Sequence, residues 1–246
     1  MGVEERQRVL EALPASMSDA EASPPEGDRH FSAKVEALET LRGYFGRKGR
    51  RIYIASELTV YYPEAQRFSP DLLAVLDVDP HEREKWVVST EGKGLDLALE
   101  IHVGGDRKKD SERNVQLYAA LKIPEYFIYD RARQRLLGYR LLPGGTYAPI
   151  LPQVGRYASQ VLGLDLMLEE GRLRFYDATA RILDTSELVA HLEQLVGTVQ
   201  ERLDEEVRLR QEEARLRQEE ARLRAEAEAR VAALTAENER LKKGKS

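Results

Sequence analysis

Two acidic residues stand in segments whose other residues predict buried β-strands. Asp71 opens the apolar run 72–76, and Glu100 lies within the apolar run 95–103. An ionised carboxylate in a strand core is costly unless it is paired, hydrogen-bonded or bound to a metal. The two acids therefore form a candidate active site. Two alternatives stay open: Asp71 as the cap of a turn at a strand start, and Glu100 as half of a structural pair.

His102 follows Glu100 by two residues, so their side chains share one face of the predicted strand with Asp96. We interpret Asp96 as a structural residue at the entry of the strand. His102 is a candidate for orienting a water molecule or donating to a phosphate, and a structural role beneath the site is the alternative.

Lys108 and Lys109 are the cationic candidates near the two acids, because they lie at the start of a predicted helix. The helix dipole disfavours positive charge at that end, so their position indicates another use. Ordinary solvated lysines are the alternative. Lys93 is a weaker candidate, and His30 and Glu36 are candidates to approach the site from the predicted first helix.

The elements that must position these residues alternate between helix and strand. Apolar residues at three- and four-residue spacing predict helices over 30–45 and 106–121. Apolar runs predict strands at 51–54, 58–62, 71–78, 86–88, 95–103 and 126–129, then a hairpin over 135–151 and short strands over 162–176. This order predicts a compact α/β core with a mixed central sheet, in which the two acids lie on adjacent central strands.

Three segments of the chain differ in composition. Residues 1–29 are expected to form a flexible segment, because 14–28 are rich in Pro, Ser, Ala and acids. Within it, 1–13 could form a short amphipathic helix. Residues 30–185 contain the α/β pattern. Residues 186–246 predict a charged helical tail, which repeats Arg-Leu-Arg-Gln-Glu-Glu-Ala at 208–214 and 215–221 and partly at 222–228.

The tail has few large apolar residues in its repeats. Each heptad supplies one leucine, whereas a strong coiled coil uses two apolar positions. Val231, Leu234, Asn238 and Leu241 alternate by three and four in another register, so we expect weak or stuttered pairing. Glu/Arg pairs four residues apart support a helix even without a partner. A parallel homodimer through the tail and a solitary solvated helix both stay open.

Composition excludes several classes of site. The formal net charge is −5, so no global basic field indicates a nucleic-acid binder, although a local basic cleft is compatible with that charge. The chain has no cysteine, which rules out disulfides, thiolate zinc sites and a cysteine nucleophile. No apolar run approaches the roughly 18 residues that span a bilayer, and charged residues fill the first dozen positions. We expect a soluble cytoplasmic protein with no membrane partner.

Several residues together carry a resemblance to a known family. They are Pro70-Asp71, Glu100, His102, Asp110, Asn114, Tyr118 and the run Pro-Glu-Tyr-Phe-Ile-Tyr-Asp at 124–130. This set resembles the PD-(D/E)XK nuclease superfamily and, more closely, the Uma-type restriction endonucleases, over residues 30–170. The resemblance implies a restriction-endonuclease-like fold and metal-dependent hydrolysis of phosphodiester bonds in DNA. Another phosphoester, such as RNA, is a weaker alternative.

The resemblance also implies roles for individual residues. Asp71, Glu100 and the backbone carbonyl of Ile101 would bind Mg²⁺, or Mn²⁺, which prefer oxygen ligands and activate a bound water. The superfamily places a lysine two residues after the second acid, where this chain has His102. The Uma-type pattern commonly places it on the following helix, where this chain has Asn114. His102 and the neighbouring lysines, Lys109 included, are therefore the catalytic candidates.

The missing lysine keeps a second function open. A nuclease fold without turnover would act as a nucleic-acid-binding or assembly module through its helical tail. Basic residues near the predicted site would either follow a phosphate backbone or be ordinary surface charges; they are Arg107, Lys108, Lys109, Arg113, Arg131, Arg133 and Arg135.

Overall fold

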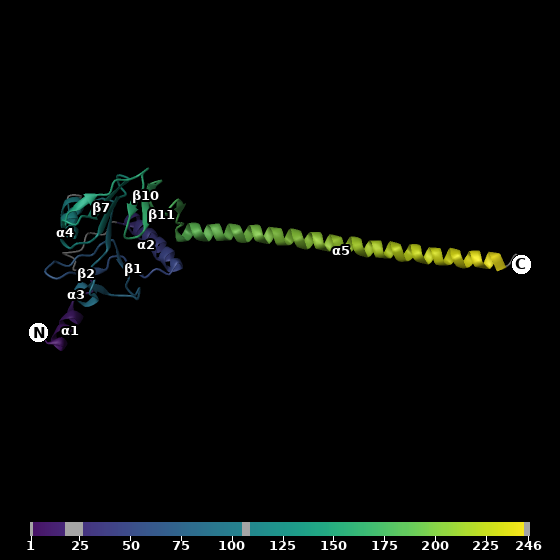
Figure 1. Ribbon diagram of the computed structural model, residues 1–246, viewed down its shortest axis with the longest axis horizontal. Coiled ribbons are helices and arrows are strands. Elements are labelled where there is room, and N and C mark those ends of the chain that lie inside the picture. The colour runs from purple at the N-terminus through teal and green to yellow at the C-terminus, as the bar shows by residue number, and fades with distance from the viewer. Residues whose placement is uncertain (1, 18–26, 105–108, 244–246) are drawn as a thin grey trace. The chain divides into compact units, whose positions relative to one another are not determined.

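The structure is a computed structural model that describes residues 2–17, 27–104 and 109–243 (Figure 1). The chain divides into two compact units, Met1–Glu187 and Leu188–Ser246. The predicted flexible segment 1–29 lies partly outside the described residues, and its described part contains helix α1 (Val3–Ala12). The segment boundaries predicted at 29 and 185 stay predictions.

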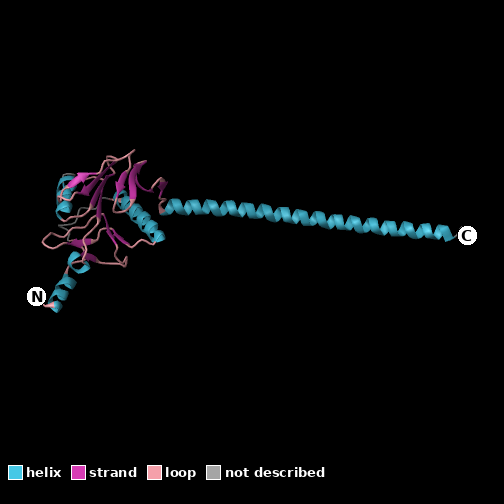
Figure 2. Ribbon diagram, viewed as in Figure 1, coloured by secondary structure: helices cyan, strands magenta, loops and turns pink. Residues whose placement is uncertain are grey.

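A six-stranded mixed sheet forms the centre of the first unit (Figure 2). Its strands, in spatial order, are β1 (Ile52–Ala55), β3 (Leu72–Leu76), β5 (Leu97–His102), β6 (Glu125–Asp130), β7 (Arg135–Leu141) and β8 (Tyr147–Pro149). β5 and β6 are parallel, whereas the other neighbouring pairs of this sheet are antiparallel. A parallel pair needs a crossover connection, and this one contains the π-helical turn η1 (Lys109–Asn114) and helix α4 (Val115–Ala120).

Helix α2 (Asp28–Lys48) packs against one face of the central sheet. Its buried Ala37, Leu41 and Phe45 belong to the same apolar cluster as Leu72 and Leu99 of the sheet. Three- and four-residue spacing places these helical residues on one stripe, which explains why the segment buries a single face. Gly49 ends the helix in the left-handed conformation, with φ of 64°.

Helix α4 packs against the opposite face of the sheet. Tyr118 of α4 is buried with Leu73, Ala98 and Ile128, whose side chains alternate with those that face α2. Because both faces are covered, the central strands are apolar over most of their length.

Smaller sheets complete the first unit. Strands β9 (Tyr157–Ser159), β10 (Leu164–Glu169), β11 (Arg172–Asp177) and β12 (Ala180–Arg181) form an antiparallel sheet that shares the apolar core of α2. Strands β2 (Thr59–Tyr61) and β4 (Lys85–Val87) form a parallel pair, followed by the short helix α3 (Val88–Glu91). Residues after α1 attach to this pair, since Lys85 Nζ donates to the Leu13 carbonyl at 2.6 Å.

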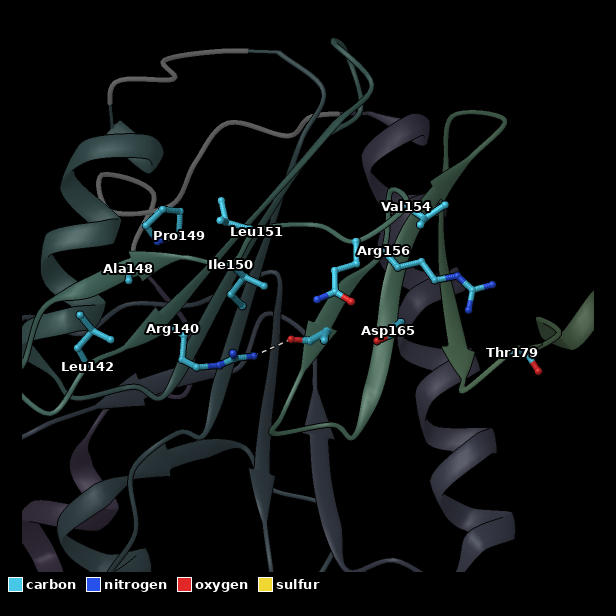
Figure 3. Close-up of a pocket in the computed structure, with 12 residues that line it drawn as sticks. Arg140, Leu142, Ala148, Pro149, Ile150, Leu151, Val154, Arg156, Asp165 and Thr179 are labelled. Carbon is cyan, nitrogen blue, oxygen red and sulfur yellow. Dashed lines mark hydrogen bonds between the residues drawn. The ribbon is translucent and has the colours of Figure 1, made fainter.

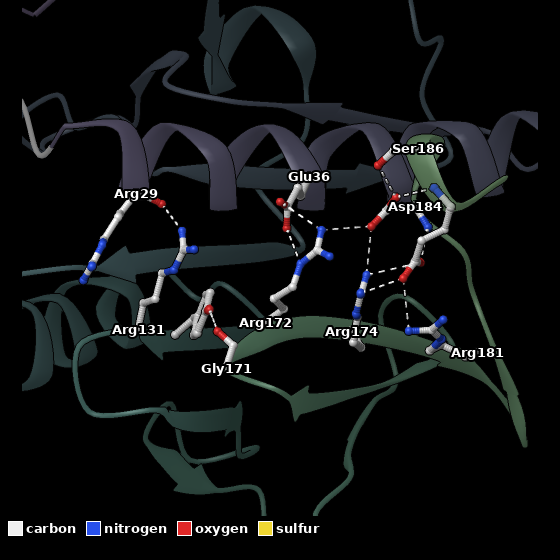
Figure 4. A network of polar contacts seen from close by, with 11 residues as sticks. Arg29, Glu36, Arg131, Gly171, Arg172, Arg174, Arg181, Asp184 and Ser186 are labelled. Carbon is white, nitrogen blue, oxygen red and sulfur yellow. Dashed lines mark hydrogen bonds and ion pairs between the residues drawn. The ribbon is translucent and has the colours of Figure 1, made fainter. Parts of the chain in front are cut away.

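A polar network fixes α2 to β11 and to the first turn of α5 (Thr185–Lys243) (Figure 4). Arg172 bridges Glu36 of α2 and Asp184 at 2.9 and 3.0 Å. Asp184 accepts the Glu187 N–H at 2.9 Å, and Glu187 accepts the Asp184 N–H at 3.1 Å. This reciprocal pair is a capping box, and it satisfies backbone donors at the helix start.

The predicted α/β architecture is confirmed, with a first helix, a mixed sheet, a second helix, a returning strand and a long C-terminal helix. The predicted strands at 58–62 and 86–88 also form, but they pair with each other as β2 and β4. Of the predicted helix over 106–121, residues 106–108 lie outside the described residues. In the ranges that the structure describes, no helix is long and apolar enough to cross a membrane.

Candidate functional site

Asp71 and Glu100 lie on adjacent strands at one end of the central sheet. In the β3–β5 ladder Leu72 is opposite Leu99, so Asp71 and Glu100 are the next two residues along the same register. The Asp71 N–H lies 3.4 Å from Glu100 Oε2, and the Ile101 N–H donates to Asp71 Oδ2 at 2.7 Å. Both acids are half-buried. They therefore meet at a sheet end that solvent can still reach.

Tyr118 connects Glu100 to the crossover helix. Its hydroxyl donates to Glu100 Oε1 at 2.6 Å, although 18 residues separate the two in sequence. The ring is buried and packs edge-on against Tyr126 of β6 at 4.8 Å between centroids. The tyrosine thus fixes one carboxylate oxygen of Glu100, and its rigid aromatic packing fixes the tyrosine.

His30 connects Asp71 to helix α2. His30 Nε2 lies 2.9 Å from Asp71 Oδ1, whereas the Ile101 N–H donates to the other carboxylate oxygen, Oδ2. The sequence already indicated His30 as a candidate from the first helix. Glu36, the other residue indicated there, points elsewhere and pairs with Arg172 at 2.9 Å.

Lys34 is a buried cation that sequence reasoning missed. It lies one helical turn after His30 on α2, is only 6% exposed and pairs with Glu57. The Glu57 N–H in turn donates to the carbonyl of Pro70, the residue before Asp71, at 3.1 Å. The available signal was a lysine within the apolar stripe of the helix, beside Ala33 and Ala37.

The geometry of β5 places the Ile101 carbonyl on the side of the strand that faces β3, where Asp71 lies. In a β-strand the N–H and C=O of one residue point to the same side, and the Ile101 N–H bonds Asp71 on the β3 side. The next residue faces the other way, since the His102 carbonyl accepts the Arg131 N–H at the end of β6. A third oxygen therefore lies near the acids without belonging to the β5–β6 ladder.

The other predicted site residues occupy different positions. His102 is 7% exposed at the end of β5, on the same strand face as Glu100. Lys108 lies outside the described residues, and Lys109 begins η1 with its side chain outside them. Lys93 lies at the opposite end of the strands, where it pairs with Asp96 at 3.1 Å, so it does not belong to this site. Asp96 accepts the Leu76 N–H at 2.7 Å, as expected of a structural acid.

Four arginines border the same end of the sheet. Arg131 follows β6 directly and donates to the carbonyl of Arg29, in the first turn of α2 (Figure 4). Arg29, Arg133 and Arg135 are exposed. These side chains bring positive charge to the edge that holds the two acids.

A separate hollow of about 700 Å³ lies between β7, β8 and the second sheet (Figure 3). Its two arginines are engaged: Arg140 donates to the Ala158 carbonyl at 2.7 Å, and Arg156 donates to the Ala178 carbonyl at 2.7 Å. The Arg156 guanidinium also stacks over Tyr176, 4.0 Å from the ring centroid. The hollow contains neither predicted acid, so we do not assign chemistry to it.

The donor set at the sheet end suits a hard divalent cation. Mg²⁺ accepts two carboxylates and a backbone carbonyl and keeps several waters, and Asp71, Glu100 and Ile101 supply these oxygens. A cage of three or more His, Asp or Glu side chains is not formed by the residues in the described ranges. Asp71, Glu100 and Ile101 are therefore the residues that could hold a divalent metal.

Comparison with known families decides the assignment. The Uma2 family, described as "Putative restriction endonuclease", matches residues 19–169, which include Asp71, Glu100 and Tyr118. The chain belongs to the Uma2 family. The resemblance noted from the sequence is thereby confirmed, and the Uma2 assignment suggests a divalent metal.

A solved structure and the curated proteins add little to the Uma2 assignment. The chain is similar to the crystal structure of a putative nuclease belonging to DUF820 from Anabaena variabilis ATCC 29413, with 14% identity and a TM-score of 0.40. The match covers 53% of this chain and 74% of that chain. No curated protein matches this chain.

Proposed function

We propose that this Uma2 protein is a Mg²⁺-dependent endonuclease that hydrolyses phosphodiester bonds in DNA, with Mn²⁺ as a substitute. The observation that carries the proposal is the meeting of Asp71 and Glu100 at one sheet end, each held by a side chain from a different helix. Such second contacts orient carboxylates for a metal.

Each residue has a distinct part in this proposal. Asp71, Glu100 and the Ile101 carbonyl would hold the ion, which when bound lowers the pKa of a coordinated water and offsets charge on the phosphate. Tyr118 occupies one oxygen of Glu100, so the other oxygen faces Asp71. His30 limits rotation of the Asp71 carboxylate.

The positive charge that a lysine supplies in related nucleases needs another source. His102 and Lys109 remain our catalytic candidates from the sequence, and the burial of His102 favours a positioning role for it. Lys34 is a further candidate, because a buried ammonium is screened less than an exposed one. It pairs with the Glu57 side chain, and the Glu57 N–H donates to the carbonyl of Pro70, the residue before Asp71.

The substrate is inferred from charge at the same edge. Arg29 and Arg131 lie where a phosphate backbone would approach the acids, and Arg133 and Arg135 extend this positive surface. Phosphate contacts release counterions, so affinity for a DNA duplex should fall steeply with salt. A flat salt response would remove these arginines from the proposal.

A plasmid-cleavage assay tests the proposal directly. Wild-type protein with Mg²⁺ or Mn²⁺ is expected to cut, and Asp71→Asn or Glu100→Gln to reduce the rate at least about 100-fold, or about 2.7 kcal/mol. Glu39→Gln, an exposed carboxylate on α2, is the control and should cleave like wild type. Cleavage unchanged in both site variants would reject the site.

A second function has its own support, because the chain has His102 where the superfamily has lysine and carries a 59-residue helix. In this alternative the fold binds nucleic acid or assembles without turnover. Titration calorimetry with Mg²⁺ separates the two: the nuclease binds metal through Asp71 and Glu100, whereas an inactive fold shows weak binding and no cleavage product.

A further inference from the structure

Helix α5 exposes an apolar and charged stripe with one continuous register. Counting from Val189 in alternate steps of three and four residues leads to Asn238 without interruption. The first part of this stripe is apolar (Val189, Leu192, Val196, Val199, Leu203) and so is the last (Ala227, Val231, Leu234). Between them Glu and Arg alternate (Glu206, Arg210, Glu213, Arg217, Glu220, Arg224). The stripe from Val189 to Asn238 therefore contains no register break, although the sequence pattern had predicted a stutter in the tail.

The apolar ends of the stripe are solvent-exposed within α5. Leu192 is 51% exposed, Val199 64% and Leu234 59%. At 1.5 Å per residue, the two apolar parts are separated by about 35 Å of charged helix. They cannot cover each other along one unbroken helix, and a second α5 helix offers a matching apolar surface.

We propose that α5 pairs with α5 of a second copy of this chain in an antiparallel coiled coil centred on residue 215. In an antiparallel pair the two core positions of the heptad face each other. With the centre at residue 215, the numbers of two facing residues add up to 430. Val196 then faces Leu234, Val199 faces Val231, and Leu203 faces Ala227. Each apolar part of one helix covers the opposite apolar part of its partner.

Charge gives the strongest argument for this direction. In the same alignment Glu206 faces Arg224, Arg210 faces Glu220, and Glu213 faces Arg217, so every charged layer is complementary. A parallel pair in register would place each of these residues against its own copy, giving six like-charge layers, and like-charge contacts are costly. The two-fold symmetry of the antiparallel pair creates each layer twice.

The alignment is also specific in register. Moving one helix by one heptad in either direction places Leu203 against Glu220 or Val231 against Glu206. Leu192 against Asn238 is the single unmatched layer of the proposed register, and one polar core position is a known means of fixing register. Leu209, Leu216 and Leu223 flank the charged layers on one side, which gives the repeated leucine a use.

Pulsed electron spin resonance on the full chain tests the direction of pairing. The chain has no cysteine, so Glu201→Cys on the outer face of α5 takes a single spin label. The antiparallel pair separates the two labels by 28 residues, or about 42 Å along the axis. A parallel pair keeps them within about 20 Å, since paired helices lie 8–10 Å apart. A short distance, or a monomeric mass of 28.0 kDa in sedimentation equilibrium, would overturn the proposal.

A charge variant tests the facing residues. Replacing Arg210, Arg217 and Arg224 together by Glu turns each complementary layer into a Glu–Glu layer, and we expect dimerisation to weaken about 100-fold or more. The matched control replaces Arg208, Arg215 and Arg222 by Glu on the outer face, with the same change in net charge. Helicity by circular dichroism is measured for both variants. Equal weakening of the two, with helicity retained, would refute the proposed facing residues.

Discussion

Two sets of acids in the central sheet differ in burial and in the elements that their hydrogen bonds connect. Glu125, at the start of β6, is 1% exposed and receives hydrogen bonds from Arg140, Ser159 and the backbone N–H groups of Gln160 and Val161. Asp71 and Glu100 are half-buried at the other end of the sheet, and they face each other. Glu125 joins two sheets, whereas Asp71 and Glu100 connect the sheet end to His30 of α2 and to Tyr118 of α4.

This difference separates a structural acid from a candidate functional one. Removing the Glu125 carboxylate would leave its Arg140, Ser159, Gln160 and Val161 donors without their acceptor, and an unsatisfied buried donor is costly. A carboxylate pair whose mutual repulsion is tolerated usually serves a ligand, at some expense in stability. The two groups should therefore respond in opposite ways to substitution and to metal.

The largest effect is expected for Glu125→Gln. The change leaves the Arg140 guanidinium without its counterion, so the free energy of unfolding should fall by about 3 kcal/mol, the lower end for a broken buried pair, because Arg140 is 30% exposed. Urea denaturation followed by circular dichroism measures it. Glu39→Gln should change stability by less than about 0.5 kcal/mol. A loss below about 1 kcal/mol for Glu125→Gln would show that Glu125 is not the structural acid inferred from its donors.

Lowering the pH should reveal the stability that Asp184 contributes, since this carboxylate also accepts hydrogen bonds from internal donors. Burial by itself raises the pKa of Asp184, but the backbone N–H of Glu187, the hydroxyl of Ser186 and the guanidinium groups of Arg174 and Arg172 outweigh it and lower the pKa to about 2. A depressed pKa stabilises the fold above the unfolded value of about 3.9. Solvent screening reduces this contribution to about 1–2 kcal/mol, and it is lost as pH falls toward 2.

The contribution of Asp184 is measured by urea denaturation of wild type and of Asp184→Asn at several pH values. Their difference in unfolding free energy should be full at pH 5 and above and shrink between about pH 4 and pH 2. A difference that stays constant over this range would show that Asp184 is not held by these donors.

Binding of Mg²⁺ at Asp71 and Glu100 should stabilise the folded protein. Mg²⁺ at about ten times its Kd should stabilise the wild-type protein by about 1.4 kcal/mol, because a ligand that binds the native state alone shifts unfolding by mass action. Differential scanning calorimetry measures the rise in Tm. Asp71→Asn should remove the rise and Glu125→Gln should keep it, and a rise that survives in Asp71→Asn would place the metal elsewhere.

The smallest effect is expected for Asp71→Asn and Glu100→Gln without metal. Each change removes one of two adjacent negative charges and retains an oxygen acceptor, so the free energy of unfolding should stay within about 1 kcal/mol of wild type. Urea denaturation in the presence of a chelator gives the value. Losses above about 2 kcal/mol for both variants would instead class these acids with Glu125 as structural.

Local sequence patterns predicted much of the fold and part of the site. The apolar stripe of α2, the runs of β3 and β5 and the hairpin β7–β8 were visible because each element repeats its side-chain period over several residues. The spacing of Asp71, Glu100 and Tyr118 indicated the family. The cost of an acid in a strand also drew attention to Asp71 and Glu100, but the same criterion applied to Glu125, whose structural role was not visible.

The sequence by itself determined which segments become helix and strand, because those preferences depend on neighbours a few residues apart. Only the tertiary structure decided that His30 approaches Asp71, that Lys34 is buried and pairs with Glu57, and that Lys93 lies at the far end of the sheet. These outcomes depend on tertiary packing, strand order and register, which bring together residues far apart in sequence, such as His30 and Asp71. The donors around Glu125 illustrate the same dependence on tertiary structure. Whether a buried charge receives hydrogen bonds depends on the assembled sheets and not on the strand that carries it.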